Sequence, residues 1–124
     1  MKRILVVDDN QTILNLVELI LQSSGYDCTK ANTAKQALEL IYNKNNNYDL
    51  ILMDLAMPEM SGIDVLTKLK QDGLLSKRNV VFFTASSLTD EQKEELKKLG
   101  ALDAMRKPFT KAELLEFVGE HVRR

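Results

Sequence analysis

The sequence predicts an α/β fold in which a five-stranded parallel sheet is covered by helices on both faces. Short apolar runs and segments with helical periodicity alternate five times along the 124 residues. Each run is apolar along most of its length, which is typical of a strand buried on both faces of a parallel sheet. Strands that alternate with helices in this way are joined by right-handed crossovers. We therefore expect one doubly wound domain.

The boundaries of the elements follow from the apolar runs and from helix-capping residues. Strands are expected at residues 3–7, 26–31, 49–53, 79–84 and 102–106. Helices are expected at residues 11–24, 34–44, 59–71 and 88–99, and after Thr110. Thr33 with Gln36 and Thr110 with Glu113 have capping-box spacing, which predicts where two helices begin. Gly100 suits the left-handed residue that ends a helix.

Apolar residues at helical spacing indicate which face of each helix packs on the sheet. The expected stripes are Ile13, Leu16, Val17, Ile20 and Leu21 in the first helix and Ile63, Leu66 and Leu69 in the third. The segment 88–99 differs, because residues 90–95 are all polar and only three leucines can anchor it. A helix with so few apolar contacts is expected to shift more easily than its neighbours.

The composition is that of an ordinary globular domain, with 44% hydrophobic and 28% charged residues. Seventeen basic and eighteen acidic residues give a formal net charge of −1, which argues against binding to nucleic acid or to an acidic membrane. Cys28 is the only cysteine, so an internal disulfide is impossible and a packed thiol is expected. Because no secretory signal or membrane-spanning run is found, we expect a cytoplasmic location.

Three acidic residues follow two of the expected strands. Asp8 and Asp9 come directly after one apolar run, and Asp54 comes directly after another. Residues just beyond the carboxyl ends of parallel strands converge on one crevice of the sheet. Three carboxylates there repel one another unless a cation lies between them. The sequence therefore predicts a hard divalent metal beside a reactive carboxylate.

Four short motifs occur in a fixed order along the chain. They are VVDDN at residues 6–10, DLAMPEMSG at 54–62, TA at 84–85 and KPF at 107–109. Together they resemble the receiver domain of response regulators in two-component signalling, and the second motif is the most specific. The resemblance extends from residue 3 to about residue 120. It implies a flavodoxin-like (βα)5 three-layer sandwich whose parallel strands have the order 2-1-3-4-5.

The resemblance also implies a role for individual residues. Asp54 matches the phosphoacceptor, whose carboxylate attacks the phosphorus of a phosphohistidine and forms an acyl phosphate. Thr84 and Lys107 match the hydroxyl and the ammonium that meet the phosphoryl oxygens. Pro108 is expected to hold its peptide bond with Lys107 in the cis form, as the family does. Without the motifs, Asp54 could equally be a helix cap and Thr84 a residue that simply suits a strand.

The metal-binding residues implied by the resemblance are carboxylates and one carbonyl. Asp8, Asp9 and Asp54 supply the side chains, and Ala56 supplies its backbone carbonyl. Mg²⁺, or Mn²⁺ in its place, takes oxygen ligands of this kind and keeps several waters. Asp9 or Asn10 can also be explained as the cap of the first helix. Asp8 is harder to explain without a metal.

Three positions depart from the family pattern or vary within it. The family carries an aromatic switch residue three positions before the lysine, and Ala104 stands there. We therefore expect the signal to leave by another route, through the fourth helix or Met105. Ala56 and Ser86 stand where the family's residues flank the path of a hydrolytic water, and both are small, so the resemblance implies an open path. His121 is expected to be an exposed residue at a helix end and not a phosphodonor.

The family usually carries an output domain, and nothing follows residue 124 in this sequence. We therefore expect a stand-alone switch, with one domain over residues 1–124, no output domain and no role as a metabolic enzyme. The phosphodonor is expected to be a histidine kinase or a phosphotransfer protein. An unidentified downstream protein is expected at the surface of the fourth helix, fifth strand and fifth helix.

Three alternatives remain open. A phosphohydrolase of the haloacid dehalogenase type needs Asp-x-Asp, whereas residues 54–56 read Asp-Leu-Ala. A flavin or nucleotide binder needs a Ser/Thr/Gly-rich phosphate loop after the first strand, where two acidic residues stand instead. A pseudo-receiver, a binding scaffold that acts without phosphorylation, usually lacks an acid, the hydroxyl or the lysine, and all of these are present here. The missing aromatic residue at Ala104 keeps this alternative open.

Overall fold

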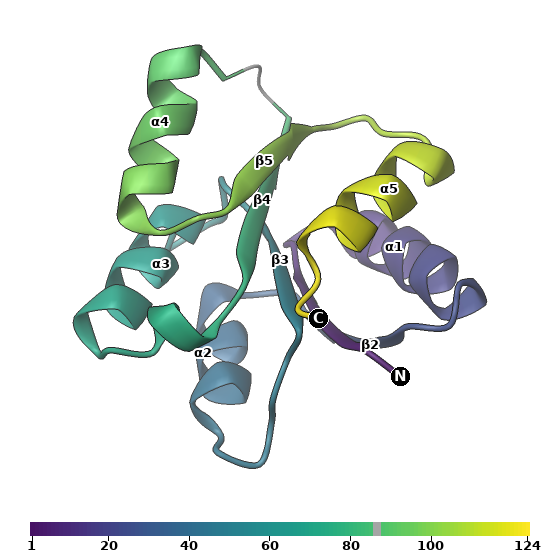
Figure 1. Ribbon diagram of the computed structural model, residues 1–124, viewed down its shortest axis with the longest axis horizontal. Helices are drawn as coiled ribbons and strands as arrows, with labels where there is room; N and C mark the ends of the chain where they lie inside the picture. Colours follow the sequence, from purple (N-terminus) through teal and green to yellow (C-terminus); the bar gives the residue numbers. More distant parts are fainter. Residues whose placement is uncertain (86–87) are drawn as a thin grey trace.

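The computed structural model describes residues 1–85 and 88–124 and has the expected α/β fold (Figure 1). Its parallel strands are β1 (Arg3–Val7), β2 (Asp27–Ala31), β3 (Leu50–Asp54), β4 (Val80–Thr84) and β5 (Asp103–Arg106). They form one sheet in the order β2-β1-β3-β4-β5. The helices are α1 (Gln11–Ser23), α2 (Ala34–Tyr42), α3 (Gly62–Gln71), α4 (Asp90–Leu99) and α5 (Lys111–His121), with a short 3-10 helix η1 (Leu75–Lys77). The expected fold class and strand order are confirmed.

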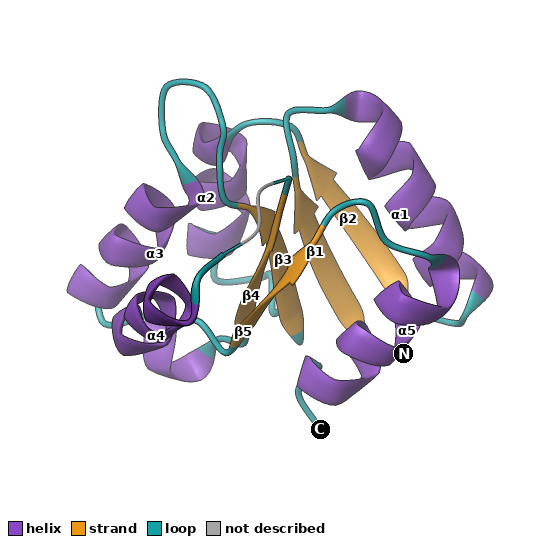
Figure 2. Ribbon diagram, turned by 90° about the horizontal axis from the view of Figure 1, so that it is seen from above, coloured by secondary structure: helices purple, strands orange, loops and turns teal. Residues whose placement is uncertain are grey.

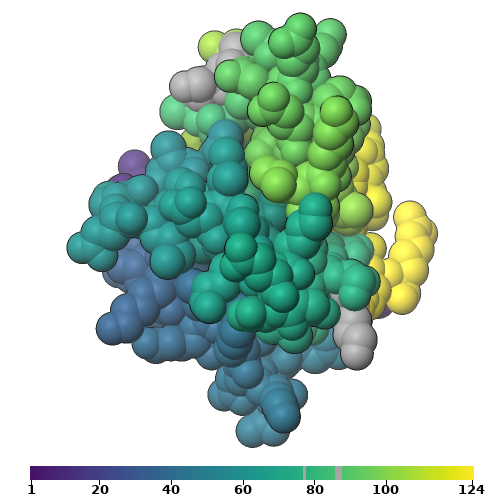
Figure 3. Space-filling model, turned by 90° about the vertical axis from the view of Figure 1, so that its left-hand side faces the viewer, coloured from purple at the N-terminus to yellow at the C-terminus, as the bar shows by residue number. Residues whose placement is uncertain are grey.

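The helices form two layers, one on each face of the sheet. α1 and α5 cover one face, and α2, α3 and α4 cover the other (Figure 2). In Figure 3 the latter three helices form one outer face, coloured from blue to green. Ile4 and Val6 of β1 contribute to the core under α1 and α5, whereas Leu5 and Val7 contribute to the opposite core. Alternate residues thus enter different cores, which explains why the strands are apolar throughout.

The side chain that precedes each α-helix decides where the helix begins. Asn10 caps α1 by accepting a hydrogen bond from the Ile13 N–H at 3.2 Å, so Asn10 and not Asp9 has the capping role. The Thr110–Glu113 capping box at α5 is confirmed. Thr33 caps α2 as expected, but without the reciprocal half of the box.

Two helices begin later than expected. α3 begins at Gly62 and not at residue 59, because Ser61 and Asp64 form a capping box there. α4 begins at Asp90 and not at residue 88, because Thr89 and Gln92 form another. The expected end of α4 is confirmed, since Gly100 has a φ of 113°.

The expected apolar stripes are correct apart from one residue in each of two helices. Leu16 of α1 is 48% exposed and Ile63 of α3 is 38% exposed, while Leu14 and Val65 are buried in their places. Both helices carry more apolar residues than one helix face can bury, so periodicity alone wrongly assigned Leu16 and Ile63 to the buried face. In α4 only Leu96 is buried, which agrees with the expected thin packing of that helix.

Two single residues outside the site also have defined surroundings. Cys28 is a buried free thiol, as expected, and its burial raises the pKa of the thiol to about 12. His121 is not the exposed residue that we expected, because its ring lies against Phe117 and its Nε2 is 3.0 Å from Asp103 Oδ2.

Among the described residues, no helix is long and apolar enough to cross a membrane.

Candidate functional site

The carboxyl ends of four strands bring the expected site residues to one edge of the sheet. Asp54 and Thr84 are the last residues of β3 and β4, and Asp8 and Lys107 follow β1 and β5. Backbone hydrogen bonds extend the ladder past the strand ends: the Lys107 N–H donates to the Thr84 carbonyl at 2.7 Å, and the Asp8 N–H donates to the Ala31 carbonyl at 3.1 Å. The sheet itself therefore positions these side chains.

Lys107 joins two of the carboxylates. Its ammonium lies 2.6 Å from Asp8 Oδ2 and 3.5 Å from Asp54 Oδ2. The same nitrogen lies 4.6 Å from the centre of the Phe83 ring, an aromatic contact that the sequence did not lead us to expect. The peptide bond between Lys107 and Pro108 is cis, as expected. The lysine is thus held between an acid pair and an aromatic ring.

The three expected metal-binding carboxylates also meet. Oxygen atoms of Asp8, Asp9 and Asp54 all lie within 4.8 Å of one another. Asp8 is fully buried and Asp54 is 6% exposed, whereas Asp9 is exposed. Asp8 Oδ1 accepts a hydrogen bond from the Asn10 N–H at 2.9 Å, which fixes the orientation of the carboxylate.

This set of donors fits a hard divalent cation. Mg²⁺ and Mn²⁺ take oxygen ligands, and a cluster of carboxylates open on one side leaves room for the waters that such ions retain. In the described part of the chain, Lys107 is the basic group that pairs with these acids, so three carboxylates face one ammonium. The remaining negative charge is what a bound cation would neutralise.

The environment of Asp54 disfavours its charged form. Burial, and then repulsion by Asp8, raises the pKa of Asp54 to about 6, while Lys107 and the Ala56 N–H act in the opposite direction. The Ala56 N–H donates to Asp54 Oδ1 at 3.3 Å. A buried carboxylate with nearby positive donors is able to act as a nucleophile once its charge is balanced.

The loop between β3 and α3 follows Asp54 closely. A Cβ on Gly62 would lie 2.6 Å from the Asp54 carbonyl oxygen and 2.7 Å from Phe82 Cε1, so only glycine fits. The Gly62 N–H donates to the Leu55 carbonyl at 2.9 Å, which closes the loop. Glu59 in this loop has a φ of 68°, an uncommon value for a residue with a side chain. No sequence pattern pointed to Glu59.

The remaining expected residues lie beside the cluster or away from it. Thr84 is 6% exposed at the end of β4. Ala104 is half-buried on the edge strand β5 and pairs with Phe82 of β4, so it lies along the strand and not among the acids beyond the strand ends. A narrow gap that is too small for water separates Ala104 from Leu96 of α4. Ser86 lies outside the described residues.

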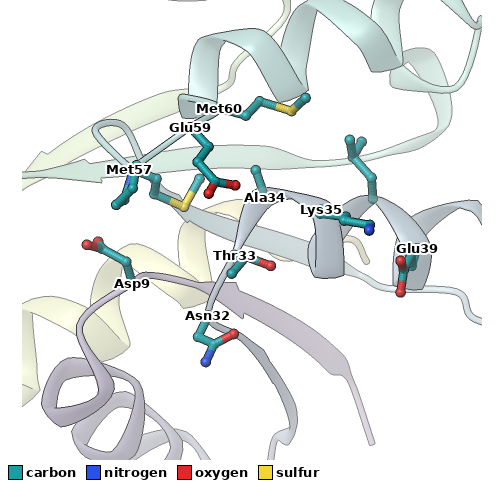
Figure 4. A pocket seen from close by; sticks show the side chains of 11 residues that line it. Asp9, Asn32, Thr33, Ala34, Lys35, Glu39, Met57, Glu59 and Met60 are labelled. Carbon is teal, nitrogen blue, oxygen red and sulfur yellow. The ribbon is translucent and has the colours of Figure 1, made fainter.

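A pocket adjoins the acidic cluster on the side of α2. It has a volume of about 550 Å³ and lies between the start of α2 and the loop after β3. Figure 4 shows Asp9 at one end of the pocket, Met57 and Glu59 along one wall, and Thr33 opposite. The site therefore combines an acidic cluster with a neighbouring apolar surface that a binding partner could contact.

Comparison with known proteins matches this arrangement to one family. The family model described as the response regulator receiver domain matches residues 4–119. The phosphate regulon transcriptional regulatory protein PhoB of Pseudomonas aeruginosa is 35% identical over 92% of this chain and 48% of its own length. The uncharacterized transcriptional regulatory protein YrkP of Bacillus subtilis is 37% identical over 98% of this chain and 50% of its own. The chain thus spans about half the length of these curated relatives.

Solved structures agree with the sequence comparison. The receiver domain of the Francisella response regulator 1452 has a TM-score of 0.86 at 33% identity and covers 97% of this chain and 95% of its own. The chemotaxis protein CheY4 of Vibrio cholerae has a TM-score of 0.87 at 27% identity, with 98% and 99% covered. The response regulator TrrA of Thermotoga maritima, solved in complex with Mg²⁺-BeF, has a TM-score of 0.79 at 32% identity, with 97% and 98% covered.

Proposed function

The chain belongs to the response regulator receiver domain family of two-component systems, and we propose that Asp54 is its phosphoacceptor. The observation that carries this proposal is the position of the Asp54 carboxylate. It lies 3.5 Å from the Lys107 ammonium and within 4.8 Å of the oxygens of Asp8 and Asp9. A nucleophilic oxygen therefore stands between a fixed cation and a cluster of metal-type ligands.

The proposed reaction is a phosphoryl transfer from a phosphohistidine. A carboxylate oxygen of Asp54 forms a bond to phosphorus, the bond between phosphorus and the imidazole nitrogen breaks, and the nitrogen keeps the electron pair. The product is an acyl phosphate on Asp54. Lys107 offers its ammonium to the negative charge on the transferred group, and Thr84 is placed at the same edge of the sheet to offer a hydroxyl.

We propose Mg²⁺, or Mn²⁺ in its place, as the cofactor. Asp8, Asp9 and Asp54 would hold the ion with their carboxylates, and Ala56 is proposed to add its backbone carbonyl. When bound, the ion would supply positive charge that offsets the negative charge on the phosphoryl oxygens. The similar receiver TrrA, which is solved in complex with Mg²⁺-BeF, supports this choice.

On this proposal the chain is a switch. Receiver domains of response regulators interact with histidine kinases and with downstream effectors, and we propose a histidine kinase or a phosphotransfer protein as the phosphodonor. The downstream partner is proposed to bind the surface of α4, β5 and α5. The chain would catalyse only its own phosphoryl transfer and dephosphorylation. The cytoplasmic location expected from the sequence stays a prediction.

One observation favours a second candidate, a pseudo-receiver that acts without phosphorylation. Ala104 stands where the family places its aromatic switch, and it lines a narrow gap beside α4 that is too small for water. The two candidates differ at Asp54. Borohydride reduction of a protein treated with an acyl-phosphate donor converts an aspartyl phosphate to homoserine, which peptide mass spectrometry then locates. We expect homoserine at position 54, whereas its absence there would support the pseudo-receiver.

A further inference from the structure

A second pocket lies at the opposite edge of the sheet from Asp54. It opens between the ends of α3 and α4 and the residues that precede β4 and β5. Its volume is about 470 Å³, and sites for small molecules typically measure about 300–1,000 Å³. The apolar lining residues are Gly73, Leu75, Leu99, Gly100 and Leu102. The length of the strands separates this pocket from the acidic cluster.

The polar lining of this pocket is basic. Lys70, Arg78 and Lys98 line it together with Ser76 and Asn79, and its described lining includes no Asp or Glu. Among the ion pairs of the described residues, none joins one of these three cations to a carboxylate. The carboxyl ends of α3 and α4 each contribute about −0.5 charge. The lining of the pocket is therefore positive after both helix ends are counted, although Lys98 also borders Glu94 and Glu95.

Arg78 is the most buried of the three cations that line this pocket. Its Nε is buried and has no hydrogen-bond partner in the described part of the chain. Its Nη1 reaches Asn47 Oδ1 at the long distance of 3.5 Å. Lys70 donates to the backbone carbonyl of Lys98 at 3.4 Å, also a long contact. Both contacts are to neutral oxygens at long range, so neither Lys70 nor Arg78 has a charged partner among the described residues.

We propose that this basic pocket binds a phosphate-bearing small molecule whose apolar part packs on Leu75, Leu99 and Leu102. A phosphate monoester carries a charge of about −1.5 to −2 at pH 7, which is opposite in sign to the lining of the pocket. Guanidinium and ammonium groups are the side chains that pair best with phosphate oxygens. The leucines distinguish this site from one for a bare anion, because inorganic phosphate would leave them uncovered.

The binding of two phosphate monoesters that carry an aromatic group tests this proposal. The probes are adenosine monophosphate and phenyl phosphate, added to the whole chain in the presence of EDTA so that no metal bridges a probe to the acidic cluster. Adenosine is the control that lacks the phosphate group, and inorganic phosphate is the control that lacks the apolar part. Amide chemical shifts measured by NMR report the site. We expect both monoesters to shift residues 70–79 and 98–102 and to bind at least about tenfold more tightly than either control.

Charge variants locate the binding. Lys98→Gln and Arg78→Gln each remove one cation from the pocket, and Lys111→Gln removes an exposed one at the start of α5. Loss of one charge-assisted hydrogen bond is expected to weaken binding of the monoesters about tenfold in the two pocket variants and not in the third. Three results overturn the proposal: no shifts at these residues with either monoester, equal binding of inorganic phosphate, or equal binding by Lys98→Gln and Lys111→Gln.

Discussion

The Lys107 ammonium lies 2.6 Å from Oδ2 of Asp8, although the two residues are 99 positions apart in the chain. Asp8 is fully buried, so the ion pair is largely removed from water. The pair links the end of the first strand to the end of the last one, and it holds the ammonium 3.5 Å from Asp54. One contact therefore serves both the stability of the fold and the geometry of the site.

Replacing Lys107 by alanine leaves Asp8 buried without its basic partner. We expect Lys107→Ala to lower the free energy of unfolding in EDTA by about 3 kcal/mol, because breaking a buried ion pair is costly. Mg²⁺ can replace part of the lost charge, so the rise in Tm on adding Mg²⁺ should be larger in the variant than in the parent chain. Thermal unfolding with and without Mg²⁺ measures both. Lys111→Ala, at an exposed lysine, is the control, and an equal Mg²⁺ response in all three proteins would contradict this account.

The raised pKa of Asp54 predicts a pH dependence of stability in the metal-free protein. The pKa is about 6 in the folded chain and 3.8 in the reference state, so the folded state binds more protons between these values. Stability therefore falls as the pH rises from about 4 to about 6 and changes little above that range. The variant Asp54→Asn lacks this titration. Urea unfolding in EDTA across this range should show the parent chain losing stability relative to Asp54→Asn, and a constant difference would refute the assignment.

Gly62 is a position where any side chain collides with backbone. We expect Gly62→Ala to lower the free energy of unfolding by about 2 kcal/mol, because the added Cβ meets the Asp54 carbonyl and the Phe82 ring. The matched control is Gly119→Ala in α5, where a Cβ meets nothing within 4 Å. That change should raise stability by about 0.5–1 kcal/mol, as alanine favours a helix. Denaturant unfolding of both variants measures these changes. An unchanged free energy of unfolding in Gly62→Ala would contradict the prediction.

Cys28 should be an unreactive thiol in the folded chain. Its pKa of about 12, raised mainly by burial, leaves little thiolate at pH 8. Reaction with a disulfide reagent at this pH should be at least about a hundredfold slower in the native protein than in urea. Equal rates in the two solvents would show that Cys28 is accessible. The measurement also tests the packing of β2 under α1.

Periodicity and motifs were sufficient to predict the fold and the residues of the acidic cluster. The apolar strands indicated a parallel sheet, and the acidic residues at their ends indicated that Asp8, Asp9 and Asp54 would meet. Periodicity failed where apolar residues were in excess, as at Leu16 and Ile63. It could not place His121, because the contact with Asp103 joins elements whose packing no local pattern specifies.

The features that the sequence did not predict depend on contacts between residues far apart in the chain. The 2.6 Å pairing of Lys107 with Asp8 depends on the strand order, which sequence spacing does not contain. The aromatic contact of Lys107 with Phe83 depends on the register of β4 against β5, where Phe83 pairs with Met105. The basic pocket around Arg78 was not expected either, since its cations are spread over two helices and a connecting segment.

The central claim is that Asp54 accepts a phosphoryl group, and intact-protein mass tests it most directly. The protein is incubated with Mg²⁺ and a small acyl-phosphate donor, alongside a sample in EDTA and the variant Asp54→Asn. We predict a gain of one phosphate that requires Mg²⁺ and is absent from the variant. A gain that persists in Asp54→Asn would contradict the account, because another residue would then be the acceptor.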